Sequence, residues 1–240
     1  MLGLLKNKIK AALLPYDPKA QAFDRFYEEL LQSKAFPQFF KIPLAYNLLS
    51  LREEQFLEEI LQRNRTNTVV DFGCGLGLAR AKAKDREAPW YGIDFSKVAI
   101  RQCQEQFPSE NWQHSYLPER LTQRCDLLIA IDSLYHPPMR SRQLWLKKLL
   151  SQVHGEALII QNSKEREEFL PINGFKLTLI ETGQEFHERC LALEKFLLSE
   201  DVKEEKRHLP LLWATIEREN NSHLKTRPKR MIALYEKITS

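Results

Sequence analysis

The sequence contains little glycine, and it has no long apolar run. Glycine occurs only eight times in 240 residues, so any local concentration of it is informative. Because no stretch of about twenty apolar residues occurs, the sequence predicts no membrane span. Residues 1–15 mix Leu and Ile with three lysines and lack a continuous apolar core, so we expect no signal peptide.

The cysteines are also few, and they form no pattern typical of disulfides or zinc. No Cys-x-x-Cys pair and no partnered histidine spacing involves any of the four, which are Cys74, Cys103, Cys125 and Cys190. We therefore expect reduced thiols in a cytoplasmic protein, and no structural metal.

Neither sign of charge dominates. The 36 basic and 32 acidic residues give a net charge of +4, which is too mild to require nucleic acid or another polyanion as a partner. Hydrophobic residues make up 43% of the chain, which is ample for a core. A length of 240 residues fits one enlarged α/β domain, or a domain with an appendage.

The most informative segment is Thr-Val-Val-Asp-Phe-Gly-Cys-Gly-Leu-Gly at 68–77. Its apolar run predicts a buried parallel strand that stops at Asp71. The alternating glycines that follow permit a sharp turn and allow a ligand to lie against the backbone. A second strand-like run stops at Asp94, where the carboxyl end of a neighbouring strand would meet a ribose hydroxyl pair. These features together predict a nucleoside-binding site.

Strand and helix patterns alternate from residue 67 onward. Apolar runs predict strands over 67–72, 89–93, 111–116, 126–131, 156–161, 175–181 and 230–237. Apolar periodicity predicts helices over 18–34, 50–63, 76–85, 96–106, 138–153 and 164–170, and Ser96 is placed to cap one of them. Such alternation is typical of a doubly wound α/β fold, with a mostly parallel sheet and helices on both faces.

Two further features concern domain organisation. We expect an N-terminal helical cap over 1–64 and a catalytic domain over 65–240. Within that domain, residues 183–228 separate the last two predicted strands and contain amphipathic segments, which predicts a helical insert before the last strand.

The glycine spacing discriminates between cofactors. A dinucleotide fingerprint, Gly-x-Gly-x-x-Gly, does not close, because its third glycine would fall on Leu78 or Arg80. The segment from Asp71 to Gly77 instead resembles motif I of the class I S-adenosylmethionine-dependent methyltransferases, acid-x-Gly-x-Gly-x-Gly. The resemblance covers about 50–181 and 229–238, and it implies a Rossmann-like seven-stranded sheet with an antiparallel last strand. The cofactor it implies is S-adenosylmethionine.

The resemblance also implies which residues hold this cofactor. An acid at the end of the first strand suits its ammonium group, and Asp94 would accept from both ribose hydroxyls. Ser115 stands where many members of the family carry an acid that accepts from the adenine amino group. The implied cofactor residues are Asp71, Gly73, Cys74, Gly75, Gly77, Asp94, Phe95, Ser115, Tyr116 and Asp132.

The end of the fourth predicted strand reads Asp132-Ser-Leu-Tyr135-His136, and in the family this position lies beside the transferred methyl group. His136 is the candidate general base, because an ordinary imidazole pKa of about 6.5 suits proton removal near neutral pH. Asp132 would orient His136 or a substrate amine, and Tyr135 completes the candidate catalytic set. The Asp/Asn-Pro-Pro-Tyr sequence typical of enzymes that methylate nucleobase amines is absent.

The sequence therefore predicts methyl transfer to oxygen or nitrogen of a small molecule or short peptide, including a carboxylate or hydroxyl, with no nucleic-acid partner. Three alternatives stay open. These are a methyltransferase that acts on RNA or protein, a nicotinamide oxidoreductase, and a non-catalytic protein that keeps the fold.

Overall fold

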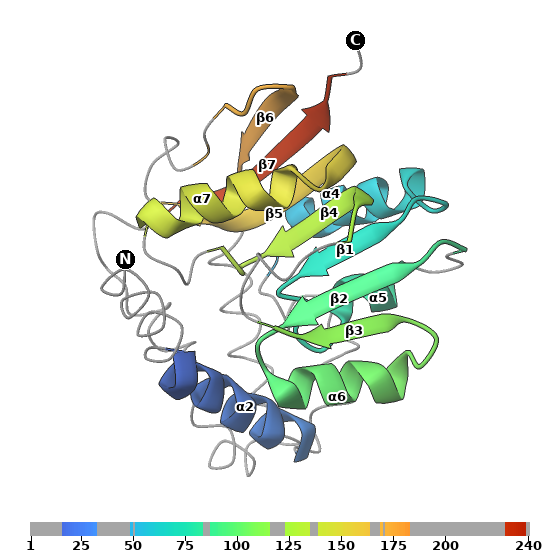
Figure 1. Ribbon diagram of the computed structural model, residues 1–240, viewed down its shortest axis with the longest axis vertical. Coiled ribbons are helices and arrows are strands. Elements are labelled where there is room, and N and C mark those ends of the chain that lie inside the picture. The colour runs from blue at the N-terminus through green and yellow to red at the C-terminus, as the bar shows by residue number, and fades with distance from the viewer. Residues whose placement is uncertain are drawn as a thin grey trace, which may run out of the picture.

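A computed structural model describes residues 16–32, 49, 51–83, 87–115, 123–134, 139–163, 169, 171–182 and 229–238. Its seven-stranded sheet has the order β3-β2-β1-β4-β5-β7-β6 (Figure 1). The strands are β1 (Val69–Phe72), β2 (Trp90–Asp94), β3 (Asn111–His114), β4 (Cys125–Ile131), β5 (Val153–Ser163), β6 (Phe175–Glu181) and β7 (Lys229–Lys237).

The pairing of the strands confirms the predicted doubly wound α/β fold. Strands β1 to β5 run parallel, whereas β7 lies antiparallel between β5 and β6. The central strands are nearly continuous apolar runs because helices cover both of their faces. In Figure 1 the arrowheads of β1, β2 and β4 point the same way, so the polar residues that end these strands lie at one edge of the sheet.

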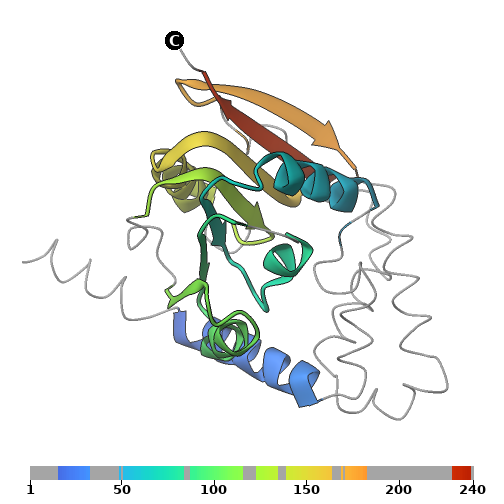
Figure 2. The same cartoon turned by 90° about the vertical axis from the view of Figure 1, so that its right-hand side faces the viewer.

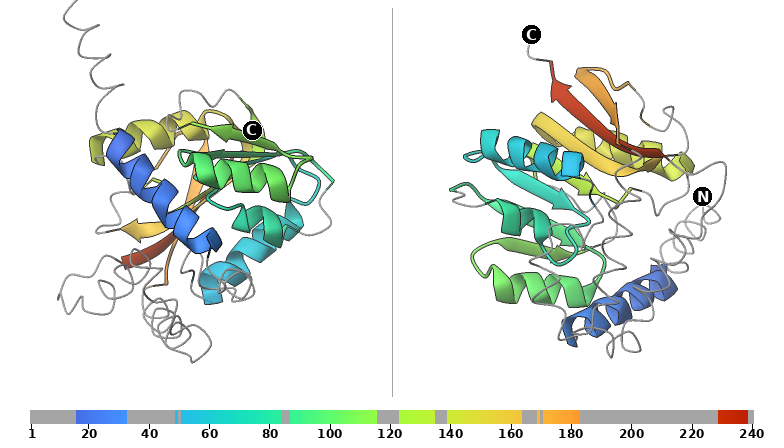
Figure 3. Two further views of the ribbon diagram at one scale, coloured as in Figure 1. Left: turned by 90° about the horizontal axis from the view of Figure 1, so that it is seen from below. Right: turned by 180° about the vertical axis from the view of Figure 1, so that it is seen from behind.

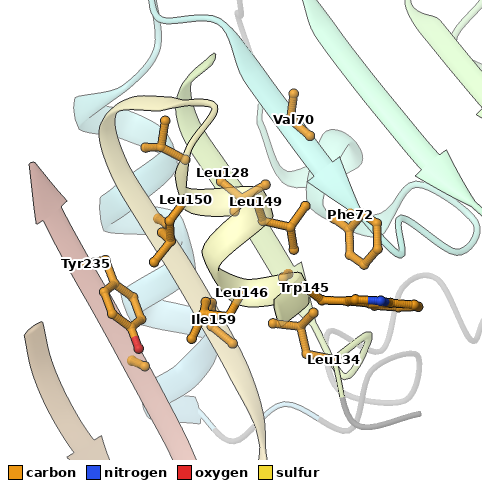
Figure 4. Close-up of a cluster of buried hydrophobic side chains, with 14 of the residues drawn as sticks. Val70, Phe72, Leu128, Leu134, Trp145, Leu146, Leu149, Leu150, Ile159 and Tyr235 are labelled. Atoms are coloured by element: carbon orange, nitrogen blue, oxygen red, sulfur yellow. The ribbon is translucent and has the colours of Figure 1, made fainter. Parts of the chain in front are cut away.

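One face of the sheet is covered by α7 (Met139–Leu150). Apolar side chains of α7, including Trp145, Leu146 and Leu149, pack on every second residue of the central strands (Figure 4). Phe72 of β1 meets the Trp145 ring edge-on, with centroids 6.0 Å apart. This cluster continues across the antiparallel strands to Tyr235. It fixes the position of α7 against the sheet.

The opposite face is covered by α4 (Leu51–Arg63) and α5 (Leu78–Lys82), as the edge-on view in Figure 2 shows. Leu57, Ile60 and Leu61 of α4 are buried in one core cluster with the alternate residues of β1, β4, β5 and β7. Lys82 of α5 forms an ion pair with Glu54 of α4.

The remaining helices lie beside β3. Helix α6 (Lys97–Gln106) packs against β3 and β2, and α2 (Tyr16–Gln32) packs against α6 rather than on the sheet (Figure 3). Among the described residues, no helix combines the length and apolar character needed to cross a membrane.

The structure corrects some predicted boundaries. The helix expected over 138–153 ends at Leu150, because the Gln152 N–H donates to the Leu149 carbonyl in a turn and Val153 then pairs with Cys125. Helix α5 is shorter than expected, and β5 is longer at both ends. Most of the helix predicted at 164–170, and all of the insert at 183–228, fall outside the described residues.

Candidate functional site

The chain leaves β1 through a turn built on glycine. The backbone N–H groups of Gly73 and Cys74 both donate to the Ile93 carbonyl, at 2.7 and 3.1 Å. A Cβ atom at Gly73 would stand 2.3 Å from Cβ of Ser133, so the loop passes directly against the end of β4. Left-handed backbone, which favours glycine, recurs with φ values of 78°, 51° and 80° at Gly73, Gly75 and Gly77.

Asp94 connects this loop to β2. It is only 4% exposed. Its Oδ2 accepts the Gly75 N–H at 2.9 Å, and its Oδ1 accepts the Ser96 N–H at 2.7 Å. Burial raises the pKa of Asp94 to about 6, although these amide groups act in the opposite direction. Since each carboxylate oxygen accepts more than one hydrogen bond, Asp94 keeps the capacity to bind two hydroxyl groups.

Asp71 lies on the same face of the sheet, one strand away. Its Cα is in register with that of Gly92, two residues before Asp94. Burial, and then the charge of Asp94, raise the pKa of Asp71 to about 8. Within the described part of the chain, Oδ2 of Asp71 has no hydrogen-bond partner. A cation placed beside this carboxyl group would therefore be strongly favoured.

Buried oxygens without a partner recur along this edge. Among the described residues, four such oxygens lie within two residues of the carboxyl ends of β3, β1, β4 and β5: Ser115 Oγ, Asp71 Oδ2, Ser133 Oγ and Gln161 Oε1. A fifth such atom, Glu29 Oε2, is in α2. An unsatisfied buried polar group costs about 1–3 kcal/mol, so their alignment along one edge of the sheet indicates a surface that receives a polar ligand.

The loop after β2 is held by α2. Oγ of Ser96 accepts the Ala99 N–H at 3.1 Å, which confirms Ser96 as the N-cap of α6. The same hydroxyl donates to Oδ1 of Asp24 in α2. Phe95, one of the implied cofactor residues, meets Phe23 of α2 edge-on with centroids 5.0 Å apart. Helix α2 therefore lies against the residues that flank Asp94.

The other predicted site residues divide into two groups. Asp132 has the positive φ of 53°, and its N–H donates to the Ile160 carbonyl at 2.8 Å, so it follows β4 beside the end of β5. Such backbone conformations in residues other than glycine concentrate at functional sites. Three predicted residues lie outside the described part of the chain: Tyr116, Tyr135 and His136.

The Cys74 side chain turns inward, although the residue was predicted at the cofactor. Its thiol packs in a buried cluster with Cys103 and Ile100. Burial is the main reason that its pKa is well above the ordinary thiol value. Only the Cys74 backbone therefore remains as a candidate for ligand contact. No group of three or more His, Cys, Asp or Glu side chains among the described residues is arranged to hold a metal ion.

Sequence reasoning missed two residues at this site. Gln161 directly follows the apolar run at 157–160, as Asp132 follows the run at 126–131, and this parallel was available in the sequence. The contact between Asp24 and Ser96 spans 72 residues, and no local pattern reveals it.

No protein-family model matches the chain, and no curated protein matches it in sequence. Its fold is similar to that of solved structures. Phosphoethanolamine N-methyltransferase 2 of Haemonchus contortus, in complex with phosphomonomethylethanolamine and S-adenosylhomocysteine, has a TM-score of 0.62 and 13% identity over 89% of this chain and 60% of that one. The [4+2]-cyclase SpnF has a TM-score of 0.59 and 15% identity over 94% and 98% of the two chains.

The cyclopropane synthase MmaA2 from Mycobacterium tuberculosis gives a TM-score of 0.55 and 13% identity over 89% of this chain and 98% of that chain. Together with the strand order, these likenesses show that the chain has the class I S-adenosylmethionine-dependent methyltransferase fold. By their names, the three proteins carry out three different reactions. The fold alone therefore does not fix the reaction.

Proposed function

We propose that this protein is an S-adenosylmethionine-dependent methyltransferase that modifies oxygen or nitrogen in a small molecule or short peptide. The main support is the placement of two acidic residues. Asp71 and Asp94 are both buried, lie on one face at the ends of neighbouring strands, and flank a glycine loop that a backbone hydrogen bond ties to Asp94. This arrangement suits a ligand that has both a cationic group and a pair of hydroxyls.

The residues at the edge fit the parts of this cofactor. Asp71 has an unpartnered buried oxygen for the ammonium group, counted over the described residues. Asp94 retains acceptor capacity for the ribose hydroxyls. Ser115, whose N–H donates to the Asp94 carbonyl, keeps its own hydroxyl for the adenine amino group. A structure of the same fold holds S-adenosylhomocysteine.

The electrostatics disfavour a dinucleotide. A pyrophosphate needs backbone N–H groups and positive charge nearby. Here the Gly75 N–H already donates to the Asp94 carboxylate. A second buried carboxyl group, that of Asp71, lies on the same face. The Asp94 carboxylate would repel phosphate, whereas a sulfonium or an ammonium would favour the ionised form of Asp71 and be attracted by both acids.

In the proposed reaction, the protein mainly positions groups and excludes water. When bound, the cofactor supplies an activated methyl group on a sulfonium, with a neutral thioether as the leaving group. Asp132 follows β4 next to the loop and would orient a substrate amine or a neighbouring base. We retain His136 as the proposed base for a hydroxyl or amine acceptor, with Tyr135 beside it.

Calorimetric titration of the purified protein tests the proposal. We expect S-adenosylmethionine and S-adenosylhomocysteine to bind with one-to-one stoichiometry, and NADH to give no heat above dilution. The absence of binding by either sulfur compound at large excess would contradict it. Incubation of the protein with a methyl-labelled cofactor and cell extract, followed by mass spectrometry of the labelled product, then identifies whether oxygen or nitrogen is methylated.

A further inference from the structure

The side chain of Gln161 combines deep burial with an unused hydrogen-bond acceptor. It is 3% exposed, and its Oε1 has no partner among the residues that the structure describes. By strand alternation it lies on the α7 face of β5, the face to which Ile159 contributes. Gln161 therefore lies two residues before the carboxyl end of β5, next to the end of β4.

Register places the backbone of Gln161 beside that of Asp132, while its side chain lies on the sheet face opposite to Asp71 and Asp94. Ile131 and Ile160 are paired across β4 and β5, so the next residues along the two strands, Asp132 and Gln161, are neighbours. Adjacent strands are about 4.8 Å apart, and β4 separates β5 from β1. The backbone of Gln161 is thus roughly 10 Å from that of the glycine loop.

A structural glutamine or asparagine would be paired, and the chain offers a direct comparison. Asn64, at the opposite edge of the sheet, is also buried. Its Nδ2 donates to the Ile60 carbonyl at 3.0 Å and to Oε2 of Glu156 at 2.8 Å, and its Oδ1 accepts from Asn67 at 2.7 Å. The Oε1 atom of Gln161, in contrast, accepts no hydrogen bond from any of the described residues.

The charges at this edge indicate what would bind there. Among the described residues, the charged side chains nearest the carboxyl ends of β1, β2 and β4 are acidic: Asp71, Asp94 and Asp132, of which Asp71 becomes ionised beside a bound cation. Negative charge repels an acceptor carboxylate and favours a group that brings hydrogen-bond donors. The Oε1 atom of Gln161 likewise needs a donor.

We propose that Gln161 contacts the methyl acceptor through Oε1 and selects molecules that present an N–H or O–H donor, an amine or a hydroxyl, over those that present a carboxylate. This inference rests on the proposed function, since it assumes that the neighbouring loop holds the cofactor. It makes Gln161 a specificity-determining residue, and it narrows the acceptor to amines and alcohols.

Thermal unfolding gives the first test. The variant Gln161→Met keeps the length of the side chain and removes the amide. Because Oε1 has no partner to lose, we expect an unchanged or higher melting temperature and an unchanged affinity for S-adenosylhomocysteine. The control is Gln152→Met, directly before the amino end of β5, where Nε2 donates to Oγ of Ser151. A fall of more than about 4 °C specific to Gln161→Met, which corresponds to a substantial loss of stability at this size, overturns the proposal.

Fragment binding gives the second test. The protein saturated with S-adenosylhomocysteine is titrated with benzylamine, benzyl alcohol and benzoate, which share one ring and differ in the polar group, and binding is followed by ligand-observed NMR. We expect the amine and the alcohol to bind at least about fivefold more tightly than benzoate. That preference should disappear in Gln161→Met and persist for the amine in Gln161→Glu, which retains the acceptor oxygen.

Three results overturn the inference: equal or tighter binding of benzoate, a preference unchanged in Gln161→Met, or no binding of any fragment. Failure of this inference is distinguishable from failure of the proposed function. If S-adenosylhomocysteine does not bind in the preceding titration, the proposed function fails; if it binds and the fragments behave otherwise, only the role of Gln161 fails.

Discussion

Polar groups are hydrogen-bonded to different extents at the two edges of the sheet, the amino edge where the parallel strands begin and the carboxyl edge where they end. At the amino edge, Oε1 and Oε2 of Glu156 accept from the Arg63 guanidinium at 2.5 and 3.0 Å, and Oε2 also accepts from Asn64. Oδ2 of Asp126 accepts the Thr68 N–H at 3.0 Å. At the carboxyl edge, in contrast, buried oxygens on several strands lack partners within the described part of the chain.

Both edges border the same two cores, so packing does not account for the difference. Paired polar groups at the amino edge stabilise the fold, whereas unpaired ones at the carboxyl edge reduce its stability. A chain tolerates that reduction where the groups serve a ligand, since sites that bind are commonly less stable than they would otherwise be. The comparison yields five predictions, in order of decreasing effect.

Gly73→Ala has the largest expected effect. The new Cβ would stand 2.3 Å from Cβ of Ser133, at a φ of 78°. The matched control is Gly174→Ala, which has a φ of 83° but meets only Nζ of Lys237, at 3.8 Å. Left-handed backbone alone costs about 1–2 kcal/mol in each variant, and overpacking adds about 1–3 kcal/mol at Gly73. Urea unfolding measures the loss of stability in each variant, and cofactor titration measures the loss of affinity. Equal stabilities of Gly73→Ala and Gly174→Ala would refute the close contact at Gly73.

Asp71→Asn should change how the stability of the protein depends on pH. The folded protein raises the pKa of Asp71 from 3.8 to about 8. The folded state therefore binds this proton more tightly than the unfolded state, and the associated stability is present at low pH and is lost as the pH rises through about 8. We expect urea unfolding to show wild-type stability falling relative to Asp71→Asn between these values. Parallel curves would contradict the raised pKa.

The same carboxyl group makes cofactor binding depend on pH. An ammonium beside Asp71 favours the ionised form, so binding should release a proton near neutral pH. Affinity should rise by up to about tenfold per pH unit below the raised pKa. Calorimetry in two buffers of different ionisation enthalpy measures the released proton, and Asp71→Asn should abolish this release.

Asp94→Ala should weaken cofactor binding by about 10- to 100-fold, because hydrogen bonds to a charged group contribute roughly 1.5–3 kcal/mol. Asp126→Ala is the control, since it also removes an aspartate that accepts a backbone N–H, but at the amino edge. Calorimetry should find the cofactor affinity of that control unchanged. A similar loss in both variants would indicate a general effect on folding.

Glu156→Gln should have the smallest effect. It weakens the pairing with Arg63, whose side chain is 48% exposed, so we expect a loss of only about 1 kcal/mol in unfolding free energy. Cofactor affinity should not change, because this pair lies at the edge away from the glycine loop. A measurable change in affinity would break the division between the two edges.

The α/β class, the alternation of elements, the glycine turn and the acids near the ends of β1 and β2 could all be predicted from the sequence. These features depend on local periodicity and on the conformational freedom of glycine, which act over a few residues. The N-cap at Ser96 belongs with them, because capping involves residues three apart. The end of α7 does not, since the segment Leu-Leu-Ser-Gln-Val at 149–153 contains no glycine or proline to end a helix, and only the pairing of Val153 with β4 shows where the strand begins.

The contacts between site residues, in contrast, follow from the folding of distant segments onto one another. This folding brought Ser133 against Gly73, Gln161 beside Asp132, and Asp24 onto Ser96. It also raised the pKa of Asp71, because desolvation depends on what covers a carboxyl group and not on its neighbours in the chain. Burial and register join residues that are distant in sequence, and for that physical reason a local pattern does not contain them.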